Sequence, residues 1–150
     1  MAHTYTDLLV HVIFSTKDRA PVLDSELRPR LFPYLGGVIR EIGGAGLLIN
    51  GPADHVHILL LLPAKTALSE IVGNLKANSS GWVHREFPNQ GAFAWQTGYA
   101  AFTVSQSQKQ TVLNCIANQV EHHRRLSFEE ELIAFLTKHK IQYDERYVFE

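Results

Sequence analysis

The sequence has little of what several classes of protein depend on. Its 150 residues include one cysteine, so no disulfide can form within the chain. Its longest apolar run, Val56 to Pro63 with a histidine inside it, is far short of the roughly 18–20 residues of a membrane span. The first residues lack a basic stretch followed by an apolar one, so we expect no secretion signal and a cytoplasmic location.

An excess of charge of either sign is also missing. The 14 Lys and Arg residues and 15 Asp and Glu residues give a formal net charge of −1. Proteins that bind duplex DNA over many phosphates usually carry a basic excess, so any nucleic-acid recognition must come from a local site. Repeats, low-complexity tracts and linkers are absent as well. We therefore expect a single domain over residues 1–150, which is long enough to bury roughly 70% of its unfolded surface.

The apolar residues alternate between the period of strands and that of helices. Strands are predicted over residues 5–14, 46–51, 55–62 and 99–105. Helices are predicted from Asp24 to Ile42, from a capping Thr66 to about Arg85, from Ser105 through Val120, and from a capping Ser127 to about His139. This order predicts an α+β sandwich, with a ferredoxin-like βαββαβ antiparallel sheet and additional C-terminal helices. The sheet face left bare by the first two helices must be covered by the C-terminal helices or by a partner subunit.

Two histidines on the third predicted strand are the first candidates for chemistry. His55 and His57 are two residues apart, so their imidazoles project from the same face of the strand. Such a pair forms a bidentate metal site, and the alternative is a hydrogen-bonded pair on a half-exposed strand. The apolar run that follows favours a buried strand, where imidazoles without a ligand would be costly.

Three kinds of phosphate chemistry use a His-hydrophobic-His motif. A histidine-triad hydrolase needs a third histidine where this chain has Leu59. A two-histidine phosphoesterase needs a second His-x-Ser/Thr motif, which the chain lacks. The third kind is a group of endonucleases in which two histidines and one further polar ligand hold a divalent cation on the scissile phosphate. That ligand should come from a helix.

The third predicted helix carries a polar stripe. Spacings of four and three place Cys115, Gln119 and His122 on one side of the helix, with His123 beside them. Taken alone, Gln119 is typical of a solvated helix surface, and Cys115 is typical of a small buried apolar residue.

Motifs spread over most of the chain resemble those of the single-tyrosine HUH transposases. The resemblance is closest to the transposases associated with repetitive extragenic palindromes (REP), within the insertion-sequence 200/605 type. The motifs are Asp54-His-Val-His-Ile-Leu, Leu75-Lys-Ala-Asn-Ser-Ser80, Phe93-Ala-Trp-Gln-Thr-Gly-Tyr99, Phe102-Thr-Val-Ser-Gln-Ser107, Asn118-Gln-Val-Glu-His-His-Arg124, Ser127-Phe-Glu-Glu130 and Tyr143-Asp-Glu-Arg-Tyr147. Each motif is weak alone, but their order and spacing are specific.

The resemblance implies nicking and joining of single-stranded DNA hairpins by metal-assisted transesterification. A helix tyrosine of such enzymes attacks the phosphate and forms a 5′-phosphotyrosine link, while a magnesium or manganese ion polarises the phosphate. On this pattern His55, His57 and Gln119 are the metal ligands. The residues expected around them are Asp54, His122 and His123. The resemblance also implies a homodimer in which the helix of one subunit can serve the metal site of the other.

The chain departs from this pattern at the nucleophile. Cys115 stands four residues before Gln119, where the family has tyrosine, and no other tyrosine lies near it in the predicted helix. A mid-helix cysteine has a shorter reach and lacks the helix N-terminus that would lower its pKa. Two functions therefore remain open: a nicking enzyme, or a domesticated hairpin-binding protein without the covalent step. With Cys115 as a soft ligand, zinc is an alternative metal.

Contacts with DNA are expected from basic, hydroxyl and aromatic side chains. The candidates for phosphate contact are Lys17, Arg19, Lys76, Ser79 and Arg124. The candidates for stacking on unpaired bases are Trp82, Phe93 and Trp95. Solvated surface charges and ordinary core aromatics are the alternatives for these residues.

Overall fold

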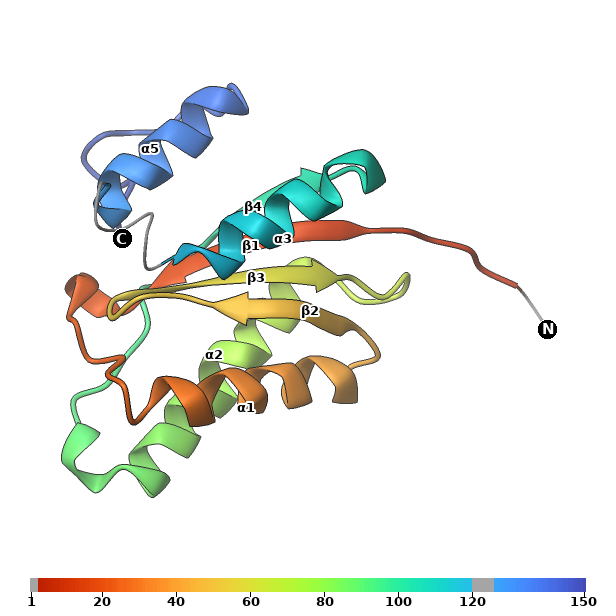
Figure 1. Ribbon diagram of the computed structural model, residues 1–150. Helices are drawn as coiled ribbons and strands as arrows, with labels where there is room; N and C mark the ends of the chain where they lie inside the picture. Colours follow the sequence, from red (N-terminus) through yellow and green to blue (C-terminus); the bar gives the residue numbers. More distant parts are fainter. Residues whose placement is uncertain (1–2, 120–125) are drawn as a thin grey trace.

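Within the described part of the chain, residues 3–119 and 126–150 of the computed structural model, a four-stranded sheet carries helices on both faces (Figure 1). The strands are β1 (Leu9–Ser15), β2 (Ala45–Asn50), β3 (His55–Leu61) and β4 (Ala100–Val104). The helices are α1 (Arg28–Glu41), α2 (Leu68–Glu86), α3 (Lys109–Ala117) and α5 (Phe128–Lys138). Single 3-10 turns are η1 (Lys17–Arg19), η2 (Pro88–Gln90) and η3 (Gln106–Gln108).

The order of strands across the sheet is β2-β3-β1-β4. Each neighbouring pair is antiparallel: β1 with β3, β1 with β4, and β2 with β3. In the chain, α1 joins β1 to β2 with β3 between them, and α2 joins β3 to β4 with β1 between them. These are the two interlocked split βαβ units of a ferredoxin-like sheet, so the predicted fold class is confirmed.

One face of the sheet packs on α1 and α2, and its two central strands present only apolar side chains there. Successive side chains of a strand alternate between faces, and every second residue of the two central strands enters this core. These residues are Val10, Val12, Phe14, Val56, Ile58 and Leu60. Leu31, Leu35 and Ile39 of α1 and Ile71 and Leu75 of α2 close over them. Burial of each such side chain contributes about 1.5–3 kcal/mol.

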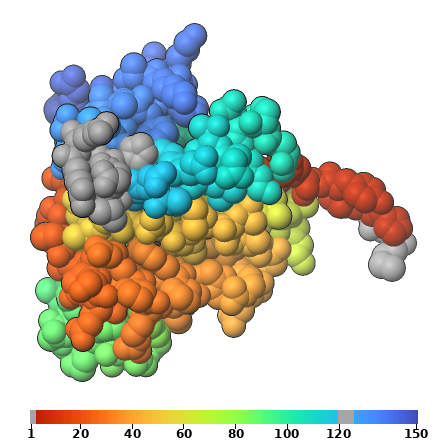
Figure 2. Space-filling view, in the orientation of Figure 1, coloured from red at the N-terminus to blue at the C-terminus, as the bar shows by residue number. Residues whose placement is uncertain are grey.

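The opposite face is covered by the C-terminal helices, which was one of the two predicted alternatives. Ile116 of α3 packs with Leu9 and Leu59, and α5 packs against Ile13 and Phe102 through its own apolar side. In Figure 1, α3 and α5 lie on the side of the sheet away from α1 and α2. The space-filling view shows the side chains of α3 directly against those of β2 (Figure 2).

The ends of the elements differ in places from those predicted. Ser127 caps α5 through a capping box with Glu130, as predicted. Thr66 does not cap α2: that prediction is wrong, because Ala67 precedes the helix and makes no side-chain cap bond. The first strand begins at Leu9 and not at Tyr5, since the exposed residues 3–8 extend away from the sheet (Figures 1 and 2).

None of the helices among the described residues has the length and apolar character needed to cross a membrane.

Candidate metal centre

The two histidines of β3 lie side by side on the face that α3 and α5 cover. Neither side chain is exposed, and their ring centroids are 5.1 Å apart. Their neighbours along the strand, Val56 and Ile58, enter the apolar core on the other face. The shared face predicted from the His-x-His spacing is therefore confirmed, and the strand is buried rather than half-exposed.

A glycine in the β2–β3 connection sets where His55 begins the strand. A Cβ atom at Gly51 would collide with the backbone carbonyl oxygen of His55, and it would lie 3.0 Å from Cα of Val56. The loop backbone also accepts a hydrogen bond from the residue that follows β1: Thr16 N–H donates to Asp54 O at 2.9 Å. Only a residue without a side chain allows this close approach.

A carboxylate from α5 lies against the histidine pair. Oε1 of Glu131 is 2.9 Å from Nε2 of His57 and 3.8 Å from Nε2 of His55, and Glu131 is 6% exposed. The three donor atoms all lie within 4.8 Å of one another. Two imidazole nitrogens and one carboxylate oxygen are suitable donors for a divalent transition metal, so this cluster fits the metal that the family resemblance implies.

The second ring nitrogen of each histidine, Nδ1, also has a hydrogen-bond partner. Nδ1 of His55 lies 2.7 Å from Oδ1 of Asp54, as expected for a residue that orients a ligand. Nδ1 of His57 lies 2.9 Å from Nε2 of His11 on β1. Burial lowers the pKa of His11 from 6.5 to about 3, the neighbouring His57 adds to the shift, and Glu131 opposes it. His11 is therefore a neutral imidazole at physiological pH.

The helix that carries Cys115 is fixed beside this cluster. Nδ2 of Asn50, at the end of β2, donates to the carbonyl oxygens of Ile116 at 2.9 Å and Ala117 at 3.3 Å. Cys115 and Glu131 line one small cavity of about 190 Å³ between α3 and α5. Gln119 is fully buried, and its Nε2 donates to Cys115 O at 3.2 Å.

The Cys115 thiol lies in surroundings that disfavour a thiolate. Burial raises its pKa, the negative charge of Glu131 raises it further, and Lys138 acts in the opposite direction. The protonated thiol is a weak nucleophile because the thiolate is the reactive form.

Two residues of this site were not singled out from the sequence: Glu131 of the cluster and His11, which lies against His57. Glu131 lies in the acidic run after Ser127, which was interpreted as a helix start, and His11 lies inside an apolar strand. His11 and Ile13 are two residues apart on β1, so their side chains lie on the same face, and Ile13 pairs with His57 across the sheet. This spacing was the signal in the sequence that could have placed His11 near the histidine pair. His122, His123 and Arg124 lie outside the described residues.

The two candidate DNA contacts on α2, Lys76 and Ser79, form hydrogen bonds to groups within the protein in this structure. Nζ of Lys76 donates to the carbonyl oxygens of Gln96 at 2.9 Å and Gly98 at 2.5 Å, and burial lowers its pKa from 10.5 to about 8. Ser79 is fully buried, donates to Leu75 O and accepts from the indole nitrogen of Trp95. In this structure the bonds of Lys76 reach the segment before β4, and those of Ser79 lie in the core.

The remaining candidates divide between surface and core. Lys17 is exposed, and Arg19 forms an ion pair with Glu129 on α5. Phe93 and Trp95 belong to the apolar core, which is the alternative given for them above. Trp82 stacks on Tyr34 with ring centroids 4.7 Å apart, between α1 and α2. The aromatic candidates therefore lie on the side of the sheet away from the two histidines.

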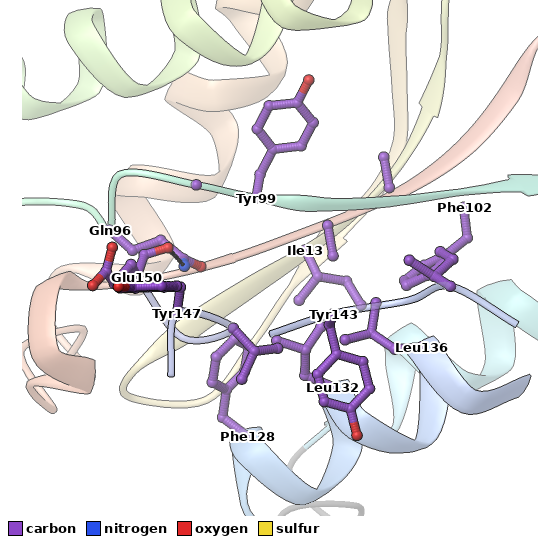
Figure 3. Close-up of a pocket in the computed structure, with 15 residues that line it drawn as sticks. Ile13, Gln96, Tyr99, Phe102, Phe128, Leu132, Leu136, Tyr143, Tyr147 and Glu150 are labelled. Carbon is purple, nitrogen blue, oxygen red and sulfur yellow. Dashed lines mark hydrogen bonds between the residues drawn. The ribbon is translucent and has the colours of Figure 1, made fainter. Parts of the chain in front are cut away.

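A larger cavity of about 440 Å³ opens beside the cluster, between β4, α5 and the C-terminal segment (Figure 3). Phe128 lines it, and the ring of Phe128 is 4.8 Å from that of His55. Tyr143 and Tyr147 of the C-terminal segment contribute exposed aromatic surface. In Figure 3 the ring of Tyr99 points away from this cavity, on the other side of β4.

Comparisons with known proteins identify the family of the chain. A family model described as "Transposase IS200 like" matches residues 4–119. The transposase of insertion sequence element IS200 from Salmonella typhimurium LT2 is 26% identical over 129 residues, which cover 83% of this chain and 84% of that protein. The ISDra2 transposase TnpA of Deinococcus radiodurans is 26% identical over 114 residues, 73% of this chain and 81% of that protein.

Solved structures give the same answer for the fold. A crystal structure of a putative transposase from Deinococcus radiodurans superposes with a TM-score of 0.65 and 26% identity, covering 79% of this chain and 96% of the other. A REP-associated tyrosine transposase bound to a REP hairpin gives a TM-score of 0.60 at 15% identity, covering 81% and 73%. Because the family model spans most of the sequence, including both histidines and Cys115, the chain belongs to the IS200-like transposases.

Proposed function

We propose that the protein acts on single-stranded DNA hairpins at a divalent-metal site formed by His55 and His57. The buried cluster of His55, His57 and Glu131 in a chain of this family is the observation that carries the proposal. The family resemblance adds Gln119 as a ligand, magnesium or manganese as the metal, and nicking and joining as the reaction. A structural relative bound to a REP hairpin supports the choice of DNA.

The roles of the residues follow from their places around the cluster. A bound cation would polarise a phosphodiester as a Lewis acid. Asp54 orients His55 through Nδ1, and the exposed Lys17 supplies a cation for contact with backbone phosphates. Tyr143 and Tyr147, at the mouth of the neighbouring cavity, offer surfaces on which unpaired bases can stack. We assign the binding of DNA to this face of the sheet.

Cys115 favours a second candidate function, a hairpin-binding protein without the covalent step. It takes the place of the tyrosine nucleophile, and its raised pKa keeps the thiol protonated near neutral pH. If its sulfur joins the two imidazoles as a ligand, the site favours zinc and resembles a structural zinc site, which leaves no open coordination position for a substrate.

A homodimer is part of the proposal. The family resemblance implies composite sites, and twofold symmetry is the commonest arrangement of small oligomers. Light scattering at micromolar concentration should report about twice the chain mass of 16.9 kDa, and a monomer would contradict this part of the proposal.

The test of the function uses the natural chain, Cys115→Tyr and Cys115→Ser with labelled single-stranded hairpin DNA and manganese. We expect all three to bind the hairpin more tightly than a blunt duplex of the same sequence. On a denaturing gel we expect no covalent adduct from the natural chain and an adduct from Cys115→Tyr, because the metal ligands are in place. Failure to bind the hairpin would overturn the proposal, and an adduct lost in Cys115→Ser would make Cys115 the nucleophile.

A further inference from the structure

We propose that the cavity between β4, α5 and the C-terminal segment binds one unpaired nucleobase of a DNA strand. The inference rests on the proposed function in one respect, that single-stranded DNA lies on the α3/α5 side of the sheet. A site for a single base would let the protein recognise one unpaired nucleotide beside the hairpin, separately from any contact with the phosphates.

The cavity has the size and the walls of a ligand site. Its volume is about 440 Å³, within the roughly 300–1,000 Å³ of small-molecule pockets, which are lined mainly by apolar and aromatic side chains. Protein interiors are otherwise close-packed, and an opening of this size forfeits dispersion contacts among the side chains that line it. A flat apolar group that enters the cavity restores those contacts.

The floor of the cavity is made of packed core side chains. Ile13, Phe102 and Phe128 line it and are 1%, 4% and 3% exposed, and all three belong to one apolar cluster. Tyr143 and Tyr147 also line it and are 37% and 57% exposed. The cavity is therefore preformed at its floor, so a ligand does not lose affinity by ordering these side chains.

The charge of the lining favours a base over a phosphate group. Among the described residues that line the cavity, the acidic Glu150 is the one with a charged side chain. A phosphate would be repelled by it and would find no cation there. The neutral part of a nucleotide is its base, and aromatic side chains such as those of this lining stack on every kind of base.

One end of the cavity is polar. In Figure 3, Gln96 and Glu150 lie at one end, and Phe102 and Leu136 lie at the other. The amide of Gln96 is held in place, because its Oε1 accepts from Ser15 N–H at 2.7 Å and its Nε2 donates to Glu150 O at 2.8 Å. An amide group has two donor hydrogens and two acceptor lone pairs, so one of each remains for the polar edge of a base.

The cavity adjoins the candidate metal centre. Phe128 lines the cavity, and its ring is 4.8 Å from that of His55. Ile13, on the floor, pairs with His57 across the sheet. A strand with a phosphate at the two histidines can therefore place a nearby base in the cavity. A base held there would determine which phosphate of the strand lies at the histidines.

The first experiment measures binding of the full chain to single-stranded hairpin DNA with abasic nucleotides. Each unpaired nucleotide beside the stem is replaced in turn by an abasic one, which keeps the phosphate and removes the base. We expect one position at which the loss of the base weakens binding at least fivefold, as for stacked bases in general. If the hairpin binds and every abasic form binds equally well, the inference is overturned and the proposed function stands.

Filling the cavity should abolish that difference. Ala100 lines the cavity from β4, so the larger side chain of Ala100→Leu takes the space of the base, and this variant should bind intact and abasic hairpins equally. Thr103→Leu is the matched control, since Thr103 is exposed on the other face of β4, and it should keep the fivefold difference. Tyr147→Ala removes an exposed ring and should reduce the difference whether or not Ala100→Leu folds. A difference that Tyr147→Ala and a folded Ala100→Leu both leave unchanged would overturn the inference.

A second measurement uses no hairpin. In saturation-transfer NMR with the four deoxynucleoside monophosphates, we expect stronger transfer from the protein to base protons than to sugar protons, and loss of this transfer in Ala100→Leu. Octanoate serves as a probe for an aliphatic ligand. Transfer to octanoate alone, or to no base, would overturn the inference. Transfer to a base in a protein that binds no hairpin would contradict the proposed function and leave the base site standing.

Discussion

Along β3 the two faces of the sheet are equally well buried but differ in chemistry. On the α1/α2 side, β3 contributes Val56 and Ile58, both fully buried among other apolar side chains. On the α3/α5 side, the same strand contributes His55 and His57, which are just as inaccessible. A buried polar group is costly unless it is satisfied, so the second face needs the partners that Asp54, His11 and Glu131 supply.

On β3, therefore, the residues of one face stabilise the fold and those of the other face form the candidate metal site. Because side chains alternate along β3, a slip of one residue in its pairing would exchange the histidines with the apolar core. The observed register, Ile13 with His57 and Phe14 with Val56, holds the two sets apart. We therefore expect substitutions on one face to change the free energy of unfolding and those on the other to change metal binding.

The largest expected effect is on the apolar face. Ile58→Ala leaves a cavity under α1 and α2, and we expect the free energy of unfolding to fall by about 2–5 kcal/mol. The Mn²⁺ affinity of the protein that remains folded should be unchanged. Denaturant unfolding and a metal titration on the same preparation check both statements, and a tenfold loss of Mn²⁺ affinity would show that the two faces are coupled.

The next effect is on the polar face. His57→Ala removes one of three protein ligands, and we expect Mn²⁺ affinity to fall at least tenfold, which corresponds to about 1.4 kcal/mol. His84→Ala is the control, because His84 is exposed on α2 and its ring bonds to Phe93 O. Calorimetric titration of both variants measures the difference. Unchanged affinity in His57→Ala would remove the metal from the proposed function.

Local patterns in the sequence predicted the elements and the shared face of the histidines. The period of two on β3 placed His55 and His57 together, and the capping box at Ser127 is observed. The start of the first strand was placed too early, at Tyr5, because β-branched and aromatic residues favour a strand even where no neighbouring strand pairs with them. Residue propensity indicates that a segment favours a strand, but pairing with a neighbouring strand determines where the strand begins and ends.

The third member of the cluster could not be predicted in this way. Glu131 is more than 70 residues from His57 in the chain, and only the packing of α5 on β1 and β4 brings it close. Its neighbours in the sequence indicate a helix start, where acidic residues are common for a different reason, the helix dipole. Phe93 and Trp95 show the converse: aromatic residues suited to stacking on bases are used by the core.

The smallest effect compares the helix starts on the two sides of the sheet. Ser127 caps α5 by accepting from Glu130 N–H at 3.2 Å, and Asp24 caps the turn before α1 by accepting from Leu27 N–H at 2.8 Å. Ser127→Ala and Asp24→Ala should each lower the free energy of unfolding by about 1 kcal/mol. Only Ser127→Ala should weaken Mn²⁺ binding, by up to about fivefold, because a frayed first turn of α5 no longer holds Glu131 against the histidines. Denaturant unfolding and Mn²⁺ titration of the two variants measure both quantities, and equal Mn²⁺ affinities would show that the cap of α5 has no part in positioning the carboxylate.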